Sequence, residues 1–195
     1  MNTKLQSTYE MFQNNTGLQG CIPEELFSTC KNNLREVYGM FEGCTKLNGS
    51  NPDTTEGSSN VGISDQWFSG ATNLKSVHRF LKNCTNFVGS IPKDLFANCT
   101  SLAQTQEMFS KCISLTGSIP IELFNYCRST LTNVSYMFYG CEGLEGEFPT
   151  GTYTTTIGVN GYEICSPDDE GALQVVNTVT NYNTQIYFLD NHDLY

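Results

Sequence analysis

The stretch LAQTQEMFSKCISLTGSIPIELFNYC, residues 102–127, recurs along the chain with its apolar residues, Gly, Pro and Cys at the same spacing. Sliding the chain on itself aligns five copies, which begin at Leu5, Leu34, Leu74, Leu102 and Leu131. They share the template L-x-x-V/T-x-x-M-F-x-x-C-x-x-L-x-G-x-I-P-x-x-L-F-x-x-C, which the fifth copy loses near residue 150. Self-similarity at such a period is typical of repeat architectures.

A copy of this length cannot bury enough apolar surface to fold by itself. When successive copies stack in register, each template column becomes a continuous row of Phe, Leu, Ile or Cys, and each copy covers the apolar face of its neighbour. The repeat therefore predicts a solenoid of about five coils over residues 1–149. Extra polar residues in the second copy, 53–64, predict an insertion loop.

The local pattern predicts an α/β repeat, in which each coil contains short strands and short helical turns. Proline at the start of P-x-x-L-F-x-x-C suits the first turn of a helix, because its fixed φ fits there and its missing N–H is not needed. The L-x-G-x-I piece alternates as a strand does, and its glycine allows a tight bend. The M-F-x-x-C-x-x-L piece is compatible with a second helical turn or with a concave strand.

Residues 150–195 have a different character. Runs of β-branched and aromatic residues at 152–159, 175–180 and 185–189 alternate with Gly, Asn and Asp turns. We expect two to four short strands that form a β-rich C-terminal cap or tail, since an open last coil would leave a sheet edge exposed. At the amino end no cap is visible, which indicates a truncated array or a partner that covers it.

The L-x-G-x-I-P-x-x-L segment resembles the leucine-rich repeat. More specifically, residues 91–102 and 132–144 are similar to the BspA-like repeats of bacterial surface proteins, which carry F-x-x-C-x-x-L units. The resemblance covers residues 5 to about 149, although the period is longer than in many such repeats and the cysteine sits one residue from its usual position. It implies a secreted or cell-surface protein of adhesion or recognition, with no catalytic activity of its own.

Seven of the nine cysteines fall on two template columns. The first column holds Cys44, Cys84, Cys112 and Cys141, and the second holds Cys30, Cys99 and Cys127. No C-x-x-C occurs, and Asn15 and Ala71 replace the cysteine in two copies, which argues against a metal site or an obligatory disulfide framework. We expect a structural ladder of small, buried, reduced side chains. Stacking would still bring neighbours near enough for an occasional bridge.

The net charge and the apolar content of the chain limit the classes of partner that it can bind. Twenty acidic against ten basic residues give a net charge of −10, which repels phosphate backbones and anionic headgroups. No run approaches the ~18 apolar residues of a spanning helix. We therefore expect no nucleic-acid partner and no membrane insertion. Residues 1–6 show no secretory leader, so the chain is intracellular or its leader lies outside this sequence. The family resemblance favours an extracellular or cell-surface location.

The sequence carries no recognisable catalytic or metal-binding motif. Its two histidines, His78 and His192, have no supporting pattern, and we expect His78 to be an ordinary surface side chain. The Asp168-Asp169-Glu170 run lacks the oxygen spacing of a calcium loop. Five N-x-S/T triplets are what a Thr- and Asn-rich repeat produces by itself; they lie at Asn14, Asn48, Asn83, Asn98 and Asn133. We therefore expect no enzyme, no cofactor and no metal.

Two rows of variable residues follow the Val/Thr column and form the candidate binding surface. The first row holds Tyr38, His78, Gln106 and Ser135, and the second holds Gly39, Arg79, Glu107 and Tyr136. Aromatic and arginine side chains are frequent hot spots, so the candidate binding residues are Tyr38, His78, Arg79 and Tyr136. We expect a module that binds protein or glycan on a host or neighbouring cell. The alternatives are a structural spacer or stalk without a specific ligand, and an enzyme with its site in residues 150–195.

Overall fold

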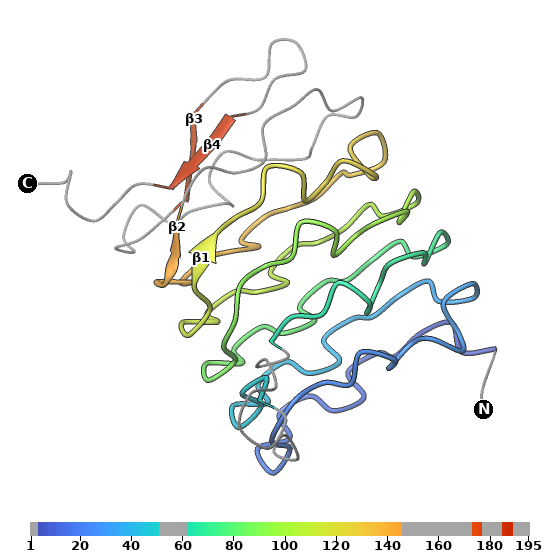
Figure 1. The fold of residues 1–195 in the computed structure, drawn as a ribbon, viewed down its shortest axis with the longest axis horizontal. Helices are drawn as coiled ribbons and strands as arrows, with labels where there is room; N and C mark the ends of the chain where they lie inside the picture. Colours follow the sequence, from blue (N-terminus) through green and yellow to red (C-terminus); the bar gives the residue numbers. More distant parts are fainter. Residues whose placement is uncertain (1–3, 51–61, 146–172, 177–184, 189–195) are drawn as a thin grey trace, which may run out of the picture.

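The computed structural model describes residues 4–50, 62–145, 173–176 and 185–188. Five successive segments of the chain lie side by side (Figure 1), and we call them coils 1 to 5. They begin at the five template leucines and cover residues 5–33, 34–73, 74–101, 102–130 and 131–145. Parallel bridges link Ser7 to Glu36, Glu36 to Ser76, Ser76 to Gln104, and Gln104 to Asn133. Equivalent positions of successive copies are therefore neighbours in space.

Alternate backbone N–H groups tie the first half of each coil to the next coil. If the leading Leu is position 0, the N–H groups at positions 3, 5, 7 and 9 donate to the carbonyls at positions 2, 4, 6 and 8 of the following coil. Between coils 3 and 4, for example, Arg79 N–H donates to Gln106 O at 3.1 Å and Leu81 N–H to Met108 O at 2.9 Å. The same four hydrogen bonds recur at each of the four contacts between coils.

Positions 5 and 9 adopt left-handed backbone in every coil. Position 5 is occupied by Glu10, Gly39, Arg79, Glu107 and Tyr136, and position 9 by Asn14, Gly43, Asn83, Lys111 and Gly140. Hydrogen bonds from residue i+3 back to residue i close the turns between them, as from Lys82 N–H to Arg79 O at 3.2 Å. The M-F-x-x-C piece is thus a chain of turns. It is neither the helical turn nor the regular strand that its spacing allows.

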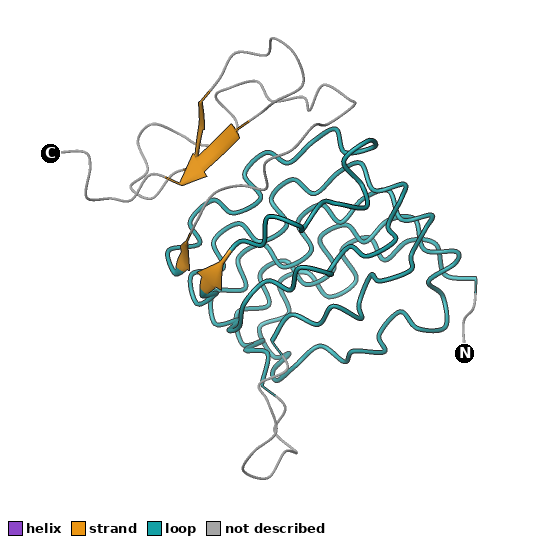
Figure 2. Cartoon of the chain, turned by 45° about the horizontal axis from the view of Figure 1, so that its top comes forward, coloured by secondary structure: helices purple, strands orange, loops and turns teal. Residues whose placement is uncertain are grey.

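The second half of each coil is also built from turns (Figure 2), and the residues that the structure describes include no α-helix. At the proline-led segment of coil 3, Leu95 N–H donates to Pro92 O at 3.2 Å, Ala97 N–H to Asp94 O at 2.9 Å and Cys99 N–H to Phe96 O at 3.0 Å. A series of turns therefore stands where a short helical turn was predicted. The segment is too short to propagate a helix. It is also held to its neighbour, as by the bond from Gly70 N–H to Ala97 O at 2.8 Å.

Two short strands mark the L-x-G-x-I piece in the last coils. Strand β1 (Gly117–Ser118) pairs in parallel with β2 (Leu144–Glu145), with Gly117 opposite Leu144. Isolated parallel bridges join the equivalent positions of the earlier coils, from Gly20 to Leu47 and from Gly89 to Leu115. The coils are therefore linked by parallel pairing on two sides.

The core consists of columns of like residues. The phenylalanines of the L-F pair, Phe27, Phe68, Phe96 and Phe124, stack with ring centroids 5.8, 6.1 and 5.9 Å apart. Each of the four is at most 1% exposed. Phe109 and Phe138, from the M-F pair, stack in the same way at 5.9 Å. Every interior coil thus packs its apolar side chains against the equivalent side chains of both neighbours.

The insertion rejoins coil 2 earlier than the predicted boundary of 53–64. Gly62, Ile63 and Ser64 are buried, and Ile63 enters the core at the position of the template Ile. Ser64 stands in the place of the template Pro, and its hydroxyl accepts the N–H of Gln66 at 3.1 Å. Residues 62–64 therefore belong to the coil, and the rest of the predicted loop lies outside the described residues.

In the tail, strand β3 (Leu173–Val176) pairs antiparallel with β4 (Gln185–Phe188), with Leu173 opposite Phe188. Both strands fall in the segment predicted to be β-rich. The strand expected at 152–159 lies outside the described residues, as does the connection from coil 5 to the tail.

Candidate functional site

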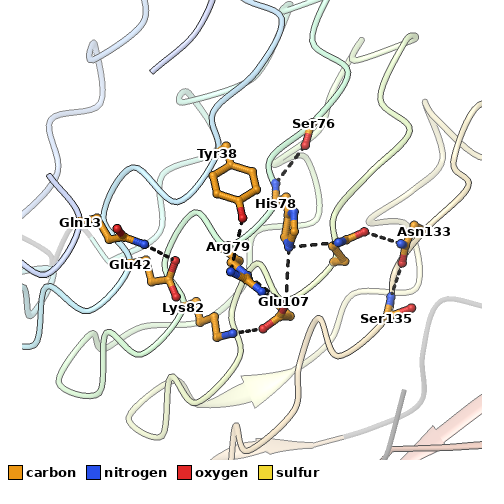
Figure 3. Close-up of polar contacts among 11 residues, drawn as sticks. Gln13, Tyr38, Glu42, Ser76, His78, Arg79, Lys82, Glu107, Asn133 and Ser135 are labelled. Atoms are coloured by element: carbon orange, nitrogen blue, oxygen red, sulfur yellow. Dashed lines mark hydrogen bonds and ion pairs between the residues drawn. The ribbon is translucent and has the colours of Figure 1, made fainter. Parts of the chain in front are cut away.

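A polar cluster extends across coils 2 to 4 where the two variable rows run over the stack (Figure 3). We call it the Glu107 cluster, and it contains Tyr38, His78, Arg79, Lys82 and Glu107. One carboxylate oxygen of Glu107 accepts Arg79 Nε at 3.0 Å, and the other accepts Lys82 Nζ. Arg79 Nη1 donates to the Tyr38 hydroxyl at 3.3 Å, and the guanidinium carbon lies 6.0 Å from the Tyr38 ring centroid. A single carboxylate thus organises side chains from three coils.

His78 is buried, with 9% of its surface exposed, which corrects the expectation of a surface side chain. Its ring makes a T-shaped contact with the ring of Tyr38, with centroids 4.7 Å apart. Asn133 donates to the Gln106 side-chain carbonyl, and the Gln106 amide nitrogen lies 3.1 Å from His78 Nε2. Nε2 of His78 also lies 3.5 Å from Oε1 of Glu107, so it accepts from Gln106 in one tautomer of the ring and donates to Glu107 in the other.

The electrostatics of the cluster follow from burial and pairing. Burial lowers the pKa of His78 below its ordinary value of 6.5 and outweighs the hydrogen bond from His78 to the Glu107 carboxylate, which raises it. Burial raises the pKa of Glu107, but hydrogen bonds from Lys82 and Arg79, together with their charges, outweigh it and hold the pKa below 4.5. At neutral pH the cluster therefore contains a neutral histidine and an ionised glutamate.

The depressed pKa of His78 predicts that the protein loses stability on mild acidification. The unfolded chain binds a proton at His78 as the pH falls through 6.5, whereas the folded chain resists it, so the free energy of unfolding falls below that pH. Protonation of Glu107 lowers the free energy of unfolding only below pH 4.5. Urea unfolding between pH 7.5 and 5 measures this, in a His192→Gln background that leaves one histidine. His78→Gln is expected to flatten the profile, and an equally steep profile in that variant would exclude His78 as its source.

The structure brings together three of the four predicted binding residues. Tyr38, His78 and Arg79 lie in the Glu107 cluster. Tyr136 occupies the same template position as Glu107 in the next coil, where it meets Tyr139 edge-on at 5.8 Å. Sequence reasoning did not select Lys82, Glu107 or Tyr9 as site residues. Tyr9 stacks on Tyr38 at 4.6 Å with an interplanar angle of 9° and is 62% exposed. Alignment of the copies could have identified Tyr9, because it occupies the same template position as Tyr38.

The cysteines of the first column form a ladder of hydrogen bonds between coils. Each thiol donates to the position 7 carbonyl of the preceding coil, as from Cys84 to Phe41 O and from Cys112 to Leu81 O, both at 3.0 Å. In the second column Cys99 donates to Phe68 O at 3.0 Å. Asn15 takes the cysteine position in coil 1, where its Oδ1 accepts the N–H groups of Gly17 and Leu18. The thiol is therefore a small buried donor that joins adjacent coils.

Burial raises the pKa of four ladder thiols to about 12. These are Cys84, Cys99, Cys127 and Cys141. Because the thiolate is the reactive form, we expect the seven ladder cysteines to resist a thiol reagent at pH 8 in the folded protein. Cys21 is more exposed and should react, as should all nine cysteines in denaturant. Timed labelling followed by peptide mass spectrometry checks this, with Cys21→Ser as the control. Rapid labelling of Cys84 or Cys112 in the folded chain would contradict the buried ladder.

Other kinds of site receive no support from the described part of the chain. It contains no group of three or more His, Cys, Asp or Glu side chains placed to hold a metal ion. None of its segments is a helix of the length and apolarity that a membrane span requires. An open groove lies on another side of coils 1 to 3, lined by Gln19, Gly20, Lys46, Asn48, Ser50 and Asn86. No family model, curated protein or solved structure matches the chain.

Proposed function

We propose that the chain is a solenoid of the leucine-rich-repeat type, related to the BspA-like surface proteins, and acts as a non-catalytic recognition or adhesion module. The parallel bridges between equivalent positions of five coils support the solenoid. The resemblance of the repeat supports the class and an extracellular or cell-surface location. Its partner is a protein or glycan on a host or neighbouring cell.

The observation that carries the proposal is the juxtaposition of Tyr9, Tyr38 and Arg79 from three coils. Tyr9 is 62% exposed, and the Arg79 side chain is 32% exposed. Arg79 donates to Glu107 and to the Tyr38 hydroxyl, and Tyr9 stacks on Tyr38, so these groups lose little conformational freedom when a ligand binds. Aromatic rings and a guanidinium supply stacking faces and hydrogen-bond donors, which suit a peptide surface or a sugar ring.

The test compares the wild-type chain with a Tyr38→Ala/Arg79→Ala variant on glycan arrays and in pull-downs from cell-surface extracts. We expect a ligand retained by the wild type to bind the variant at least about tenfold more weakly, because two hot-spot side chains are removed. Tyr126→Ala is the matched control, since Tyr126 is 44% exposed but lies in the second half of coil 4. Equal binding by the double variant would refute this surface, provided that circular dichroism shows it to be folded.

The competing proposal is a structural spacer, and one observation favours it. Arg79 and Lys82 are both paired with Glu107, so their charges already serve to join coils 3 and 4. In a spacer, Glu107→Gln would lower stability and no ligand would be retained by the wild type. In a recognition module the wild type retains a ligand, and the array experiment therefore separates the two.

A further inference from the structure

The open groove on coils 1 to 3 is a second place where polar side chains of successive coils meet, and it shares no residue with the Glu107 cluster. Its volume is about 560 Å³, which is within the range of small-molecule sites. One lysine, three amides, a serine and a glycine line it: Lys46, Gln19, Asn48, Asn86, Ser50 and Gly20. These lining residues include no carboxylate, although the chain has twice as many acidic as basic residues. The lining of the groove is therefore positively charged in a chain that is negative as a whole.

The backbone under the groove is fixed by contacts with both neighbouring coils. Asn48 N–H donates to Gly20 O at 3.1 Å, and Val88 N–H donates to Asn48 O at 3.2 Å. Gly49 has a φ of +74°, and a Cβ there would lie 3.1 Å from the Cα of Gly62 and 3.2 Å from Val88 O. The groove is thus formed by close packing of the coils, so a ligand that binds in it has little backbone to order.

The two asparagines of the groove each have one end engaged and the other end open. Asn48 Oδ1 accepts the N–H of Ser50 at 3.0 Å, and Asn86 Nδ2 donates to Thr45 O at 2.8 Å. A backbone N–H only donates and a backbone carbonyl only accepts, so these bonds fix the orientation of both amides. Within the described residues neither side chain makes another hydrogen bond. Nδ2 of Asn48 remains as a donor and Oδ1 of Asn86 as an acceptor.

Lys46 interrupts a regular contact between coils at this groove. It occupies template position 12, where Asn86 and Ser114 of the next two coils donate to the position 11 carbonyl of the preceding coil at 2.8 and 2.7 Å. Lys46 is exposed and makes neither such a bond nor an ion pair with any residue that the structure describes. Its ammonium is therefore available to an anion.

We propose that this groove binds an acidic sugar, whose carboxylate pairs with Lys46 and whose hydroxyls bond to Asn48 and Asn86. The ammonium requires an anion. The donor and the acceptor on adjacent coils suit hydroxyl groups, since a hydroxyl both accepts and donates. A short saccharide that carries a carboxylate satisfies all three groups, and the volume of the groove admits it. Because the groove is separate from the Tyr38 and Arg79 surface, either can bind its ligand without the other.

The probe is digalacturonic acid, with the corresponding neutral galactose disaccharide as its counterpart. Each is titrated into the full ¹⁵N-labelled chain, and with the acid we expect amide shift changes at residues 19–20, 46–50 and 86. The neutral disaccharide should bind at least about tenfold more weakly, because it lacks the charge-assisted hydrogen bond. Added salt should weaken the acid alone. The Tyr38→Ala/Arg79→Ala variant should bind the acid as the wild type does, which separates this site from the proposed function.

Variants of the lysine complete the test. Lys46→Met should weaken binding of digalacturonic acid at least about tenfold, whereas Lys46→Arg keeps the charge and should retain most of it. Lys93→Met is the matched control, because the Lys93 side chain is 68% exposed in the second half of coil 3. It should bind as the wild type does.

Four results would overturn the acidic-sugar site. These are no shift at the groove residues at millimolar digalacturonic acid, equal binding of the acidic and neutral disaccharides, and undiminished binding by Lys46→Met. The fourth is tighter binding of an end-blocked dipeptide of glutamate, which has the same charge as the acid and would make the groove a peptide site.

Discussion

Replacing Phe96 with alanine is expected to lower the free energy of unfolding by about 3–5 kcal/mol. The Phe96 side chain is fully buried, and its ring lies between those of Phe68 and Phe124 at centroid distances of 6.1 and 5.9 Å. The substitution removes a large apolar side chain and leaves a cavity that faces two neighbouring coils. Because the column runs through the middle of the stack, the surrounding backbone is held on both sides and cannot collapse into the gap.

Urea unfolding followed by circular dichroism measures this loss. The matched control is Ile121→Ala, since Ile121 is 59% exposed and its truncation should change the free energy of unfolding by no more than about 0.5 kcal/mol. A loss below about 1 kcal/mol for Phe96→Ala would mean that the phenylalanine column does not form in solution.

Gly89→Ala is the second substitution with a large expected effect, about 2–4 kcal/mol. Gly89 has a φ of +115°, a conformation that other residues rarely adopt. A Cβ at this position would also lie 3.1 Å from the Cα of Gly62 in coil 2. Backbone strain and close approach of two coils therefore act together.

Gly70→Ala separates the two causes. Gly70 has a φ of +82°, but a Cβ there would meet no atom within 4 Å. Its substitution should cost about 1–2 kcal/mol through backbone strain alone. Thermal and urea unfolding of both variants measure the difference, which reports the contact between coils 2 and 3. Equal losses would show that Gly62 and Gly89 do not approach each other as described.

The positions of the columns were readable from the sequence because identical spacing places like residues in like environments. The burial of the cysteine ladder could be predicted for the same reason, and the structure buries all seven of its members. The path of the backbone could not be predicted. Position 5 is left-handed in every coil although Glu, Gly, Arg and Tyr occupy it. The hydrogen bonds between coils impose this conformation. The residue types at position 5 share no preference for left-handed backbone, so the sequence does not indicate it.

The candidate site was predicted in part. Variable rows indicated Tyr38 and Arg79, and the structure places them together. The burial of His78 was missed because it depends on Tyr38 and Gln106, which belong to neighbouring coils. The role of Glu107 was missed because its partners Arg79 and Lys82 lie 28 and 25 residues away in sequence. Contacts between coils depend on the register of the neighbouring coils. The two variable rows by themselves do not specify which charged side chains form pairs.

The stacking of the coils in register is tested most directly by a distance between spin labels in electron paramagnetic resonance. Gln6 and Thr132 are exposed and occupy position 1 of coils 1 and 5. Both are replaced by Cys for labelling, in a background where Cys21 and Cys165 are Ser. Four steps of about 4.8 Å place their Cα atoms about 19 Å apart, so a narrow distribution centred at about 20–25 Å is expected. A broad distribution beyond about 40 Å would contradict the stack.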